Sequence, residues 1–378
     1  MKKICYVTTI SVTIRAFFIP QLRYLAENGY DVSVICSPDD SLAADLGENI
    51  RYIPVEIARG IQPKTLFGTI SELKKIFRQE KFDIVQYSTP NAAFCASIAS
   101  KLAGIKVRNY HLMGLRYLGM SGMERMLFKA IERFTCRLST DIECITASNL
   151  ELCLSQHLFR RGKAVIVGNG STGGIDTGRF NPEKRNSLRK SARAELSISS
   201  GSFVFGFVGR ITRDKGINEL LEAFSGLEKD CNKLLIIGDV ENIDTIDREL
   251  WQYANDCEDI IILKSTPDIE KYYAAMDILV LPTYREGFGM VIAEAEAMGV
   301  PVIVSNIPGP IDVIRDGITG LTVNVGDSED LRRKMEYLSG TPELLSEMSK
   351  QGAEFIKEKF DSDELYKKIL ERKRFLIG

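Results

Sequence analysis

Residues 278–301 read ILVLPTYREGFGMVIAEAEAMGVP, and this stretch decides the fold of the chain. The apolar run Ile278–Leu281 has the length of a buried strand. A loop through residues 286–289 then leads into a helix-forming segment, Met290–Met298, which Gly299 is placed to end. A second apolar run, Pro301–Val304, follows. The pattern predicts a strand–helix–strand unit of a parallel sheet, so the fold class is α/β.

The loop and the helix start together suit a phosphate group. Backbone N–H groups at a helix start lack internal partners and favour negative charge, and Gly287 and Gly289 let a ligand approach closely. Glu286 and Glu294 can accept hydrogen bonds from ligand hydroxyls on either side, which is the layout of a nucleotide sugar. The alternative is that Glu286 only caps the helix and Glu294 lies on a solvated face, as we expect for Glu296. The spacing alone does not decide between them.

The pattern E-G-F-G-x(4)-E-A, followed by M-G-x-P-V-I, resembles the carboxylate signature of glycosyltransferase family 4. The resemblance implies a retaining enzyme of GT-B fold, with two Rossmann-like domains whose parallel sheets face a central cleft. It further implies that Glu286 contacts the donor sugar in catalysis and that Glu294 contacts the donor ribose. The remaining donor-binding residues of this segment are then Gly287, Phe288, Gly289, Met290 and Val291.

A second candidate site follows the predicted strand Phe203–Val208, where the chain continues as Gly209-Arg210 and reaches Lys215-Gly216 before another helix. An Arg and a Lys at a strand's carboxyl end can bind an anion, although two solvated loop cations are the alternative. The pattern resembles the family's second signature, which implies that Arg210 and Lys215 stabilise the leaving diphosphate and that Gly209 contacts the donor. The resemblance also implies a base pocket at residues 264–268, including Thr266.

The segment Gly168–Gly173 matches G-x-G-x-x-G, the dinucleotide fingerprint. That fingerprint requires a helix to begin there, and turn-forming residues follow instead, so we reject a dinucleotide site. The segment resembles the hinge of the family. With 378 residues, two domains are expected. We predict an acceptor-binding domain at residues 1–168 plus a C-terminal helix at about 361–378, and a donor-binding domain at 169–360.

The first half alternates strands and helices. Predicted strands at Ile4–Val7 and Asp83–Tyr87 end in loops at 8–13 and 88–91, which we expect to line the ligand cleft. We predict one long helix at about Ile14–Asn28. The family usually carries Gly-Gly after its first strand, where this chain has Thr9-Ile10-Ser11.

The remaining candidate residues of this half belong to the predicted acceptor-binding domain. His111 ends a strand, and a lone His is more often structural, but the resemblance implies contact with the donor sugar and a catalytic role. Ser11, Arg15 and Arg116 are predicted to bind the acceptor.

Residues 116–138 contain a predicted basic amphipathic helix. Arg125, Lys129, Arg133 and Arg137 recur every four residues beside apolar side chains, as in helices that lie on anionic membranes. The alternative is a helix packed on the core with its charged face in water. Residues 1–178 carry 22 Lys and Arg against 16 Asp and Glu, whereas the rest carries 27 against 35. This asymmetry favours peripheral membrane contact.

Composition limits the other functions. No apolar stretch is long enough to span a bilayer, the start does not read as a signal peptide, and the eight cysteines are expected to be buried small hydrophobes in a reducing compartment. We therefore predict a cytoplasmic protein at the inner membrane face, with no metal, cofactor or nucleic acid. The predicted activity is sugar transfer from a nucleoside diphosphate donor, with UDP and an N-acetylhexosamine as first candidates, to a polyprenyl-diphosphate-linked saccharide. A nucleotide-sugar epimerase and a non-catalytic sensor are the alternatives.

Overall fold

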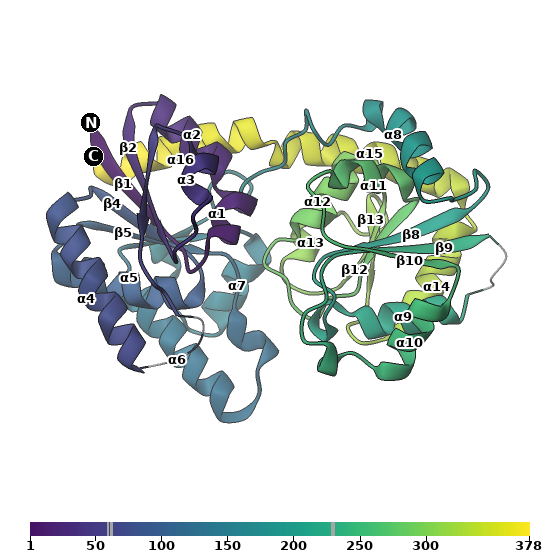
Figure 1. Cartoon of the computed structure of the whole chain (residues 1–378), viewed down its shortest axis with the longest axis horizontal. Coiled ribbons are helices and arrows are strands. Elements are labelled where there is room, and N and C mark those ends of the chain that lie inside the picture. The colour runs from purple at the N-terminus through teal and green to yellow at the C-terminus, as the bar shows by residue number, and fades with distance from the viewer. Residues whose placement is uncertain (59, 61–62, 228–230) are drawn as a thin grey trace. The chain divides into compact units, whose positions relative to one another are not determined.

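The computed structural model describes residues 1–58, 60, 63–227 and 231–378 of the chain (Figure 1). The chain divides into two compact units. Unit 1 comprises Met1–Gly174 and Ser362–Gly378, and unit 2 comprises Ile175–Asp361. The first crossing between them therefore follows Gly174, whereas the sequence placed the domain boundary at residue 168.

Unit 1 contains a seven-stranded sheet in the order β3-β2-β1-β4-β5-β6-β7. Every strand pair is parallel, and β1 lies between β2 and β4. Strands buried on both faces favour continuous apolar runs, as in Ile4–Val7 of β1, which is fully buried. The bounds are β1 (Lys2–Val7), β2 (Tyr30–Cys36), β3 (Ile50–Pro54), β4 (Ile84–Tyr87), β5 (Val107–Leu112), β6 (Asp141–Cys144) and β7 (Ala164–Val165).

The helices of unit 1 form two cores with the sheet. One core contains buried side chains of α4, α5, α6 and α7, and the other contains those of α1, α2, α3 and α16. The helix α16 thus belongs to unit 1, although it is the last element of the chain. The bounds are α1 (Ser11–Phe17), α2 (Ile19–Glu27), α3 (Leu42–Leu46), α4 (Pro63–Glu80), α5 (Pro90–Ala103), α6 (Gly122–Leu138), α7 (Ala147–Ser155) and α16 (Ser362–Ile377).

The single helix predicted from about Ile14 to Asn28 is wrong. The structure has two helices there, and the first begins at Ser11, inside the segment that was expected to be a loop. Pro20 lies in the first turn of α2, and it lacks the N–H group that a continuous helix would need. The helix therefore breaks at Phe18, just ahead of the proline.

Unit 2 contains a six-stranded parallel sheet in the order β10-β9-β8-β11-β12-β13. Residues 278–305 form β11, α12 and β12, as predicted, and β11 pairs with β8 and β12. The strands are β8 (Phe203–Val208), β9 (Asn232–Ile237), β10 (Ile260–Leu263), β11 (Ile278–Leu281), β12 (Val302–Ser305) and β13 (Gly320–Val323). The helices are α8 (Pro182–Glu195), α9 (Ile217–Ser225), α10 (Arg248–Asp256), α11 (Ile269–Ala275), α12 (Met290–Ala297), α13 (Pro310–Val313), α14 (Ser328–Ser339) and α15 (Pro342–Phe360).

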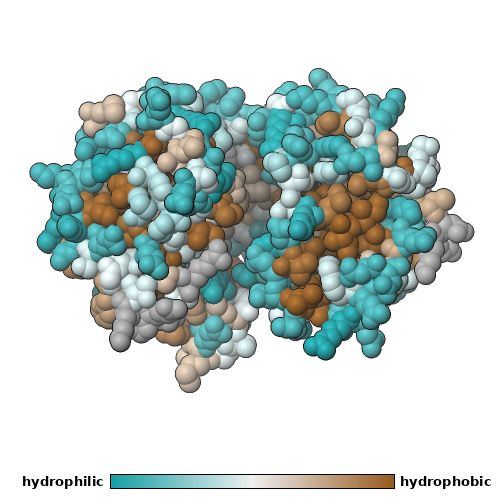
Figure 2. Space-filling model, in the orientation of Figure 1, coloured by the Kyte–Doolittle hydropathy of each residue, from teal (hydrophilic) through white to brown (hydrophobic). Residues whose placement is uncertain are grey.

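Unit 1 exposes several apolar side chains along α6. Brown and pale brown side chains occur at the lower end of this unit in Figure 2, where Figure 1 places α6. The exposed apolar side chains of this helix are Met123, Met126, Leu127 and Phe134. Within the described residues, no helix is both long enough and apolar enough to cross a membrane.

The cysteines follow the prediction only in part. All eight are free, and six are buried, but Cys231 is exposed and Cys257 is partly exposed. The prediction of buried small hydrophobes is therefore wrong for Cys231.

Candidate active site

The two sequence signatures of unit 2 meet at the carboxyl edge of its sheet. Arg210 and Lys215 follow β8, and Glu286 follows β11, which is the strand beside β8. In an open parallel sheet, the loops at this edge form the ligand site. The sequence indicated each signature separately, and the sheet order makes them neighbours.

Lys215 and Glu286 form an ion pair between these two loops. Their side chains are only 15% and 19% exposed, so the pair is largely removed from water. The backbone N–H of Gly287 donates to the other carboxylate oxygen of Glu286 at 3.0 Å, which fixes the carboxylate further. A cation and a carboxylate that can accept hydrogen bonds from ligand hydroxyls therefore lie in direct contact just ahead of α12.

Gly216 explains why Lys215 reaches this position. The chain turns sharply after Lys215, and Gly216 adopts a φ of +75°, which favours glycine. A Cβ atom there would lie 2.0 Å from the carbonyl oxygen of Pro282. Only glycine allows the two loops to approach this closely.

A second pair holds the same loops together. The guanidinium of Arg285 lies 2.7 Å from a carboxylate oxygen of Asp214. The backbone N–H of Tyr284 and the hydroxyl of Thr283 both donate to the carbonyl of Asp214, at 2.9 and 3.0 Å. Neither Asp214 nor Arg285 was among the residues predicted from the sequence. Their positions within the two signatures were the available signal.

Arg210 is arranged differently from Lys215. Its side chain is 49% exposed, and it pairs with Glu241 at 2.8 Å. An exposed pair contributes little to stability, so a bound anion can compete for this guanidinium. Gly209, the preceding residue, is hydrogen-bonded through its N–H to the carbonyl of Ile237 on β9.

Glu294 lies on α12, between the helix start and α11. The hydroxyl of Tyr273 donates to its carboxylate at 2.9 Å. Burial raises the pKa of Glu294 to about 7, and the Tyr273 hydroxyl and the Arg179 charge offset part of this rise. Arg179 also contacts the carbonyl of Pro267 and pairs with Glu270. The charge of Arg179 thus acts on Glu294 while its guanidinium contacts the predicted base loop.

Thr266 lies in that loop, and its hydroxyl accepts a hydrogen bond from the N–H of Asp268 at 3.2 Å. The side chain thus shapes its own turn. Its predicted role in donor binding stays a prediction.

Glu296 corrects the expectation of a solvated face. Its side chain is 1% exposed and lies against Gly352 of α15. Two residues along a helix turn the side chain by about 200°, so Glu294 and Glu296 point to opposite sides of α12. Both sides are covered, and burial raises the pKa of Glu296 well above its usual value.

The other predicted donor-binding residues surround the start of α12. Phe288 is buried against Phe360, with ring centroids 5.1 Å apart, which anchors the loop. Gly289 precedes the helix with a φ of +93°, and Met290 and Val291 are its first residues. The backbone of this segment carries the site, while Phe288 holds it in place.

His111 lies at the end of β5 in unit 1, with its ring packed edge-on against Phe18. Its Nδ1 atom is 3.7 Å from Oε2 of Glu143, which is too long for a hydrogen bond. Lys373 of α16 is fully buried and donates to both oxygens of Glu143, at 2.9 and 3.1 Å. Burial alone would raise the pKa of Glu143, but Lys373 and His111 outweigh it and lower the pKa.

The predicted acceptor residues Ser11 and Arg15 are engaged within unit 1. Both contact the carboxylate of Asp39, Ser11 at 2.5 Å and Arg15 at 2.7 Å. Arg15 also pairs with Asp45 at 2.5 Å. An acceptor group would have to compete with two carboxylates for Arg15. Arg116, in contrast, is exposed and stacks over the ring of Phe128 at 5.2 Å.

Comparison with known proteins covers almost the whole chain. Residues 3–148 match the family described as Glycosyl transferase 4-like, and residues 189–355 match Glycosyl transferases group 1. The chain is 30% identical over 376 residues to the capsular polysaccharide biosynthesis glycosyltransferase CapM of Staphylococcus aureus, covering 97% of this chain and 96% of the relative.

Two further proteins are similar to the chain. A UDP-Gal:alpha-D-GlcNAc-diphosphoundecaprenol alpha-1,3-galactosyltransferase of Escherichia coli is 24% identical over 317 residues, covering 82% of this chain and 80% of the relative. A glycosyltransferase crystal structure from Rickettsia africae superimposes with a TM-score of 0.83 at 20% identity, covering 100% of this chain and 99% of the other. Two Rossmann-like units, two signatures at one sheet edge and these matches together show that the chain is a glycosyltransferase of GT-B fold and belongs to glycosyltransferase family 4.

Proposed function

We propose that the enzyme transfers a sugar, with retention of configuration, from a UDP-linked donor to a hydroxyl of a polyprenyl-diphosphate-linked saccharide during assembly of a surface polysaccharide. The contact between Lys215 and Glu286 carries this proposal. It places a cation that can bind the diphosphate beside a carboxylate that can accept hydrogen bonds from the hydroxyls of the donor sugar. The Escherichia coli relative is named for a UDP-sugar donor and a GlcNAc-diphosphoundecaprenol acceptor, which supports both substrate classes.

The proposed reaction needs no nucleophile from the protein. The acceptor hydroxyl oxygen attacks the anomeric carbon on the face that the diphosphate leaves. The bond from this carbon to the diphosphate oxygen breaks, and the leaving oxygen takes the electron pair and then the hydroxyl proton. Lys215 and Arg210 stabilise the charge that develops on the diphosphate. Glu286 orients the donor sugar and Glu294 orients the ribose, and no metal or cofactor takes part.

A transfer assay tests the proposal. Purified protein is incubated with radiolabelled UDP-N-acetylglucosamine, UDP-N-acetylgalactosamine, UDP-galactose or UDP-glucose, each with a synthetic GlcNAc-diphosphopolyprenol. We expect one donor to label the lipid, with an anomeric configuration that matches the donor by NMR. Polyprenyl diphosphate without the sugar is the matched control, and we expect no label on it.

Other outcomes contradict the proposal. A labelled nucleotide sugar that changes its sugar identity while the lipid stays unlabelled would make the protein an epimerase. Nucleotide-sugar binding without turnover in any combination would make it a sensor. Lipid labelled with the opposite anomeric configuration would support sugar transfer but would show that the configuration is inverted.

We also propose that α6 rests on an anionic membrane at the cytoplasmic face, where it meets lipid-linked substrates. Arg125, Arg133 and Arg137 are exposed on the helix that also exposes Met123 and Phe134. Apolar side chains that enter the interface and cations that attract lipid headgroups reinforce each other. The helix packs on the core through its buried side, which includes Cys136 and Leu138, while Met123, Met126, Leu127 and Phe134 stay exposed and available to a membrane.

Reversal of the charges on α6 should release the protein from vesicles. We expect a combined Arg125→Glu, Lys129→Glu and Arg133→Glu variant to bind vesicles with anionic lipid at least about 100-fold more weakly, because each cation near such a surface contributes roughly 1 kcal/mol. Co-sedimentation measures this binding. The matched control reverses Lys81, Lys101 and Lys106, exposed cations of the same unit outside α6.

Arg133 needs a separate check because it also donates to the carbonyls of His157 and Gln156, at 3.1 Å each. The double variant Arg125→Glu and Lys129→Glu leaves these bonds intact and should still bind more weakly than the control. Equal sedimentation of the double variant and the wild type would contradict the membrane proposal and leave α6 as a helix whose charged face only contacts water.

A further inference from the structure

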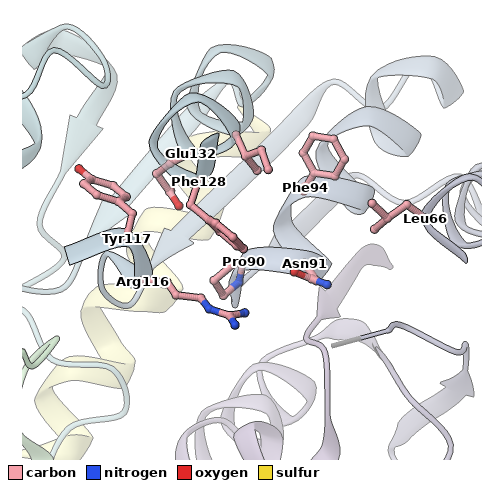
Figure 3. A pocket seen from close by; sticks show the side chains of 9 residues that line it. Leu66, Pro90, Asn91, Phe94, Arg116, Tyr117, Phe128 and Glu132 are labelled. Carbon is pink, nitrogen blue, oxygen red and sulfur yellow. The ribbon is translucent and has the colours of Figure 1, made fainter. Parts of the chain in front are cut away.

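Unit 1 contains a small pocket between α4, α5, α6 and the 3₁₀ turn Arg116–Gly119 (Figure 3). Its volume is about 80 Å³. Apolar side chains form most of its wall, and the polar side chains of Asn91, Arg116 and Glu132 also line it. The lining residues that matter here are Leu66, Phe94, Phe128, Ile131, Asn91 and Glu132.

The pocket lies where a substrate of unit 1 is expected. Asn91 follows β4, and Arg116 follows β5, so both lie at the carboxyl ends of neighbouring strands. Open α/β sheets bind their ligands at this edge. Arg116 also lines the pocket, and its guanidinium, which extends below Pro90 and Asn91 in Figure 3, adds a cation to the lining.

Glu132 is the unusual member of the lining. Its side chain is buried, with the residue only 6% exposed, and it descends from α6 as Figure 3 shows. Tyr110 forms a hydrogen bond with the carboxyl group of Glu132. The Oε1 atom of Glu132, however, has no hydrogen-bond partner among the described residues. A buried polar atom without a partner costs free energy, which a ligand atom can recover. Burial raises the pKa of Glu132 to about 7, so its neutral form can donate a hydrogen bond.

Asn91 offers the complementary group. Its amide nitrogen donates to the backbone carbonyls of Ala58 and Gly60, at 2.6 and 2.7 Å. Both amide hydrogens are then used, and the side chain can engage a ligand only as an acceptor through Oδ1. The pocket therefore combines a donor, an acceptor and an apolar wall.

We propose that this pocket binds the acetamido group of an N-acetylated sugar in the acceptor saccharide. The inference rests on the proposed function, because it assigns part of the acceptor. The acetamido methyl contacts Phe94, Phe128 and Ile131, the acetyl oxygen accepts from Glu132, and the acetamido N–H donates to Asn91.

Size and polarity distinguish this occupant from others. A cavity of about 150 Å³ holds a six-carbon benzene ring, so half that volume suits the four heavy atoms of an acetamido group. An isoprenyl unit of the lipid would leave the Glu132 oxygen unpaired. A sugar hydroxyl would leave the apolar wall without contacts. The acetamido group satisfies both features.

Binding of two matched acceptor analogues tests the inference. Calorimetry on the full chain without donor compares N-acetylglucosaminyl diphosphate and glucosyl diphosphate, each carrying the same ten-carbon alkyl chain. We expect the first to bind about 10- to 100-fold more tightly, which is the range that a small apolar group in a hydrophobic pocket gives. Equal affinities would overturn the inference.

Two variants assign the preference to this pocket. Glu132→Leu removes the donor and Ile131→Phe fills the space, and each should reduce the preference to nearly equal binding. Glu132→Gln keeps an N–H donor and should retain most of it. Leu102→Phe, at an exposed position near the end of α5, is the matched control. Thermal unfolding monitors the fold, and Ile131→Phe keeps the test decisive if Glu132→Leu does not fold.

The remaining outcomes separate this inference from the proposed function. If the pocket variants weaken both analogues equally, the pocket holds the alkyl chain and the inference is wrong. If the N-acetylated analogue binds more tightly but no donor gives sugar transfer, the acetamido site is supported and the proposed transfer reaction is contradicted. Transfer without a preference removes only the acetamido site.

Discussion

Replacement of Lys215 by Met is expected to lower turnover about 1,000-fold without unfolding the protein. Loss of one preorganised donor to a developing charge typically costs 10²–10³ in rate, and a full cation in a largely buried position belongs at the upper end. The variant also leaves the Glu286 carboxylate without its cation, close to the leaving diphosphate. Repulsion between these anions adds to the loss, so UDP affinity should fall as well.

Single-turnover rates and UDP binding by calorimetry measure both effects. Lys233→Met is the matched control, because Lys233 also pairs with a carboxylate, Asp259, at 2.7 Å, but near the amino end of β9. We expect the control to behave like the wild type. Turnover of Lys215→Met within tenfold of the wild type would remove Lys215 from leaving-group stabilisation.

Replacement of Glu286 by Gln is expected to lower turnover about 100-fold but to raise UDP affinity severalfold. The rate falls because a neutral amide orients the donor sugar less strongly than a carboxylate does. The affinity rises because Lys215 loses its internal partner and becomes fully available to the diphosphate. The two substitutions at one ion pair therefore change UDP binding in opposite directions.

This opposition separates a chemical role from a structural one. If the pair only held the loops together, both variants would weaken UDP binding and lower the melting temperature together. Glu329→Gln is the matched control, since Glu329 pairs with Arg332 on the surface of α14. Weaker UDP binding by Glu286→Gln would contradict the assignment of Lys215 to the diphosphate.

The elements around the active site could be predicted because their signals are local. The strands β8 and β11 have the predicted bounds, since each is a short apolar run that ends at polar or turn-forming residues. The strand–helix–strand unit at 278–305 also follows from Gly289, Gly299 and Pro301, which stand at the ends of its helix. The break of the helix at Phe18 also has a local cause. Pro20 could have predicted it, but the sequence was read there as one continuous helix.

The contacts that complete the site were not local. The Lys215–Glu286 pair joins residues 71 positions apart, and its existence depends on β8 and β11 being neighbours in the sheet. Glu296 is buried because α15 covers α12, and nothing near Glu296 in the sequence announces this. The burial of Glu132 was equally hidden in the sequence. Within α6 it is one charged residue among several, and it is buried only because α6 packs against α5 and β5.

The discontinuity of unit 1 has a consequence for how the chain is made. Lys373, which neutralises the buried Glu143, emerges from the ribosome after all of unit 2. Until then, Glu143 and His111 lie in an incomplete core with a carboxylate that lacks its cation. Unit 2 can therefore complete its folding first, and synthesis of the last helix becomes the step that makes the other half of the enzyme competent.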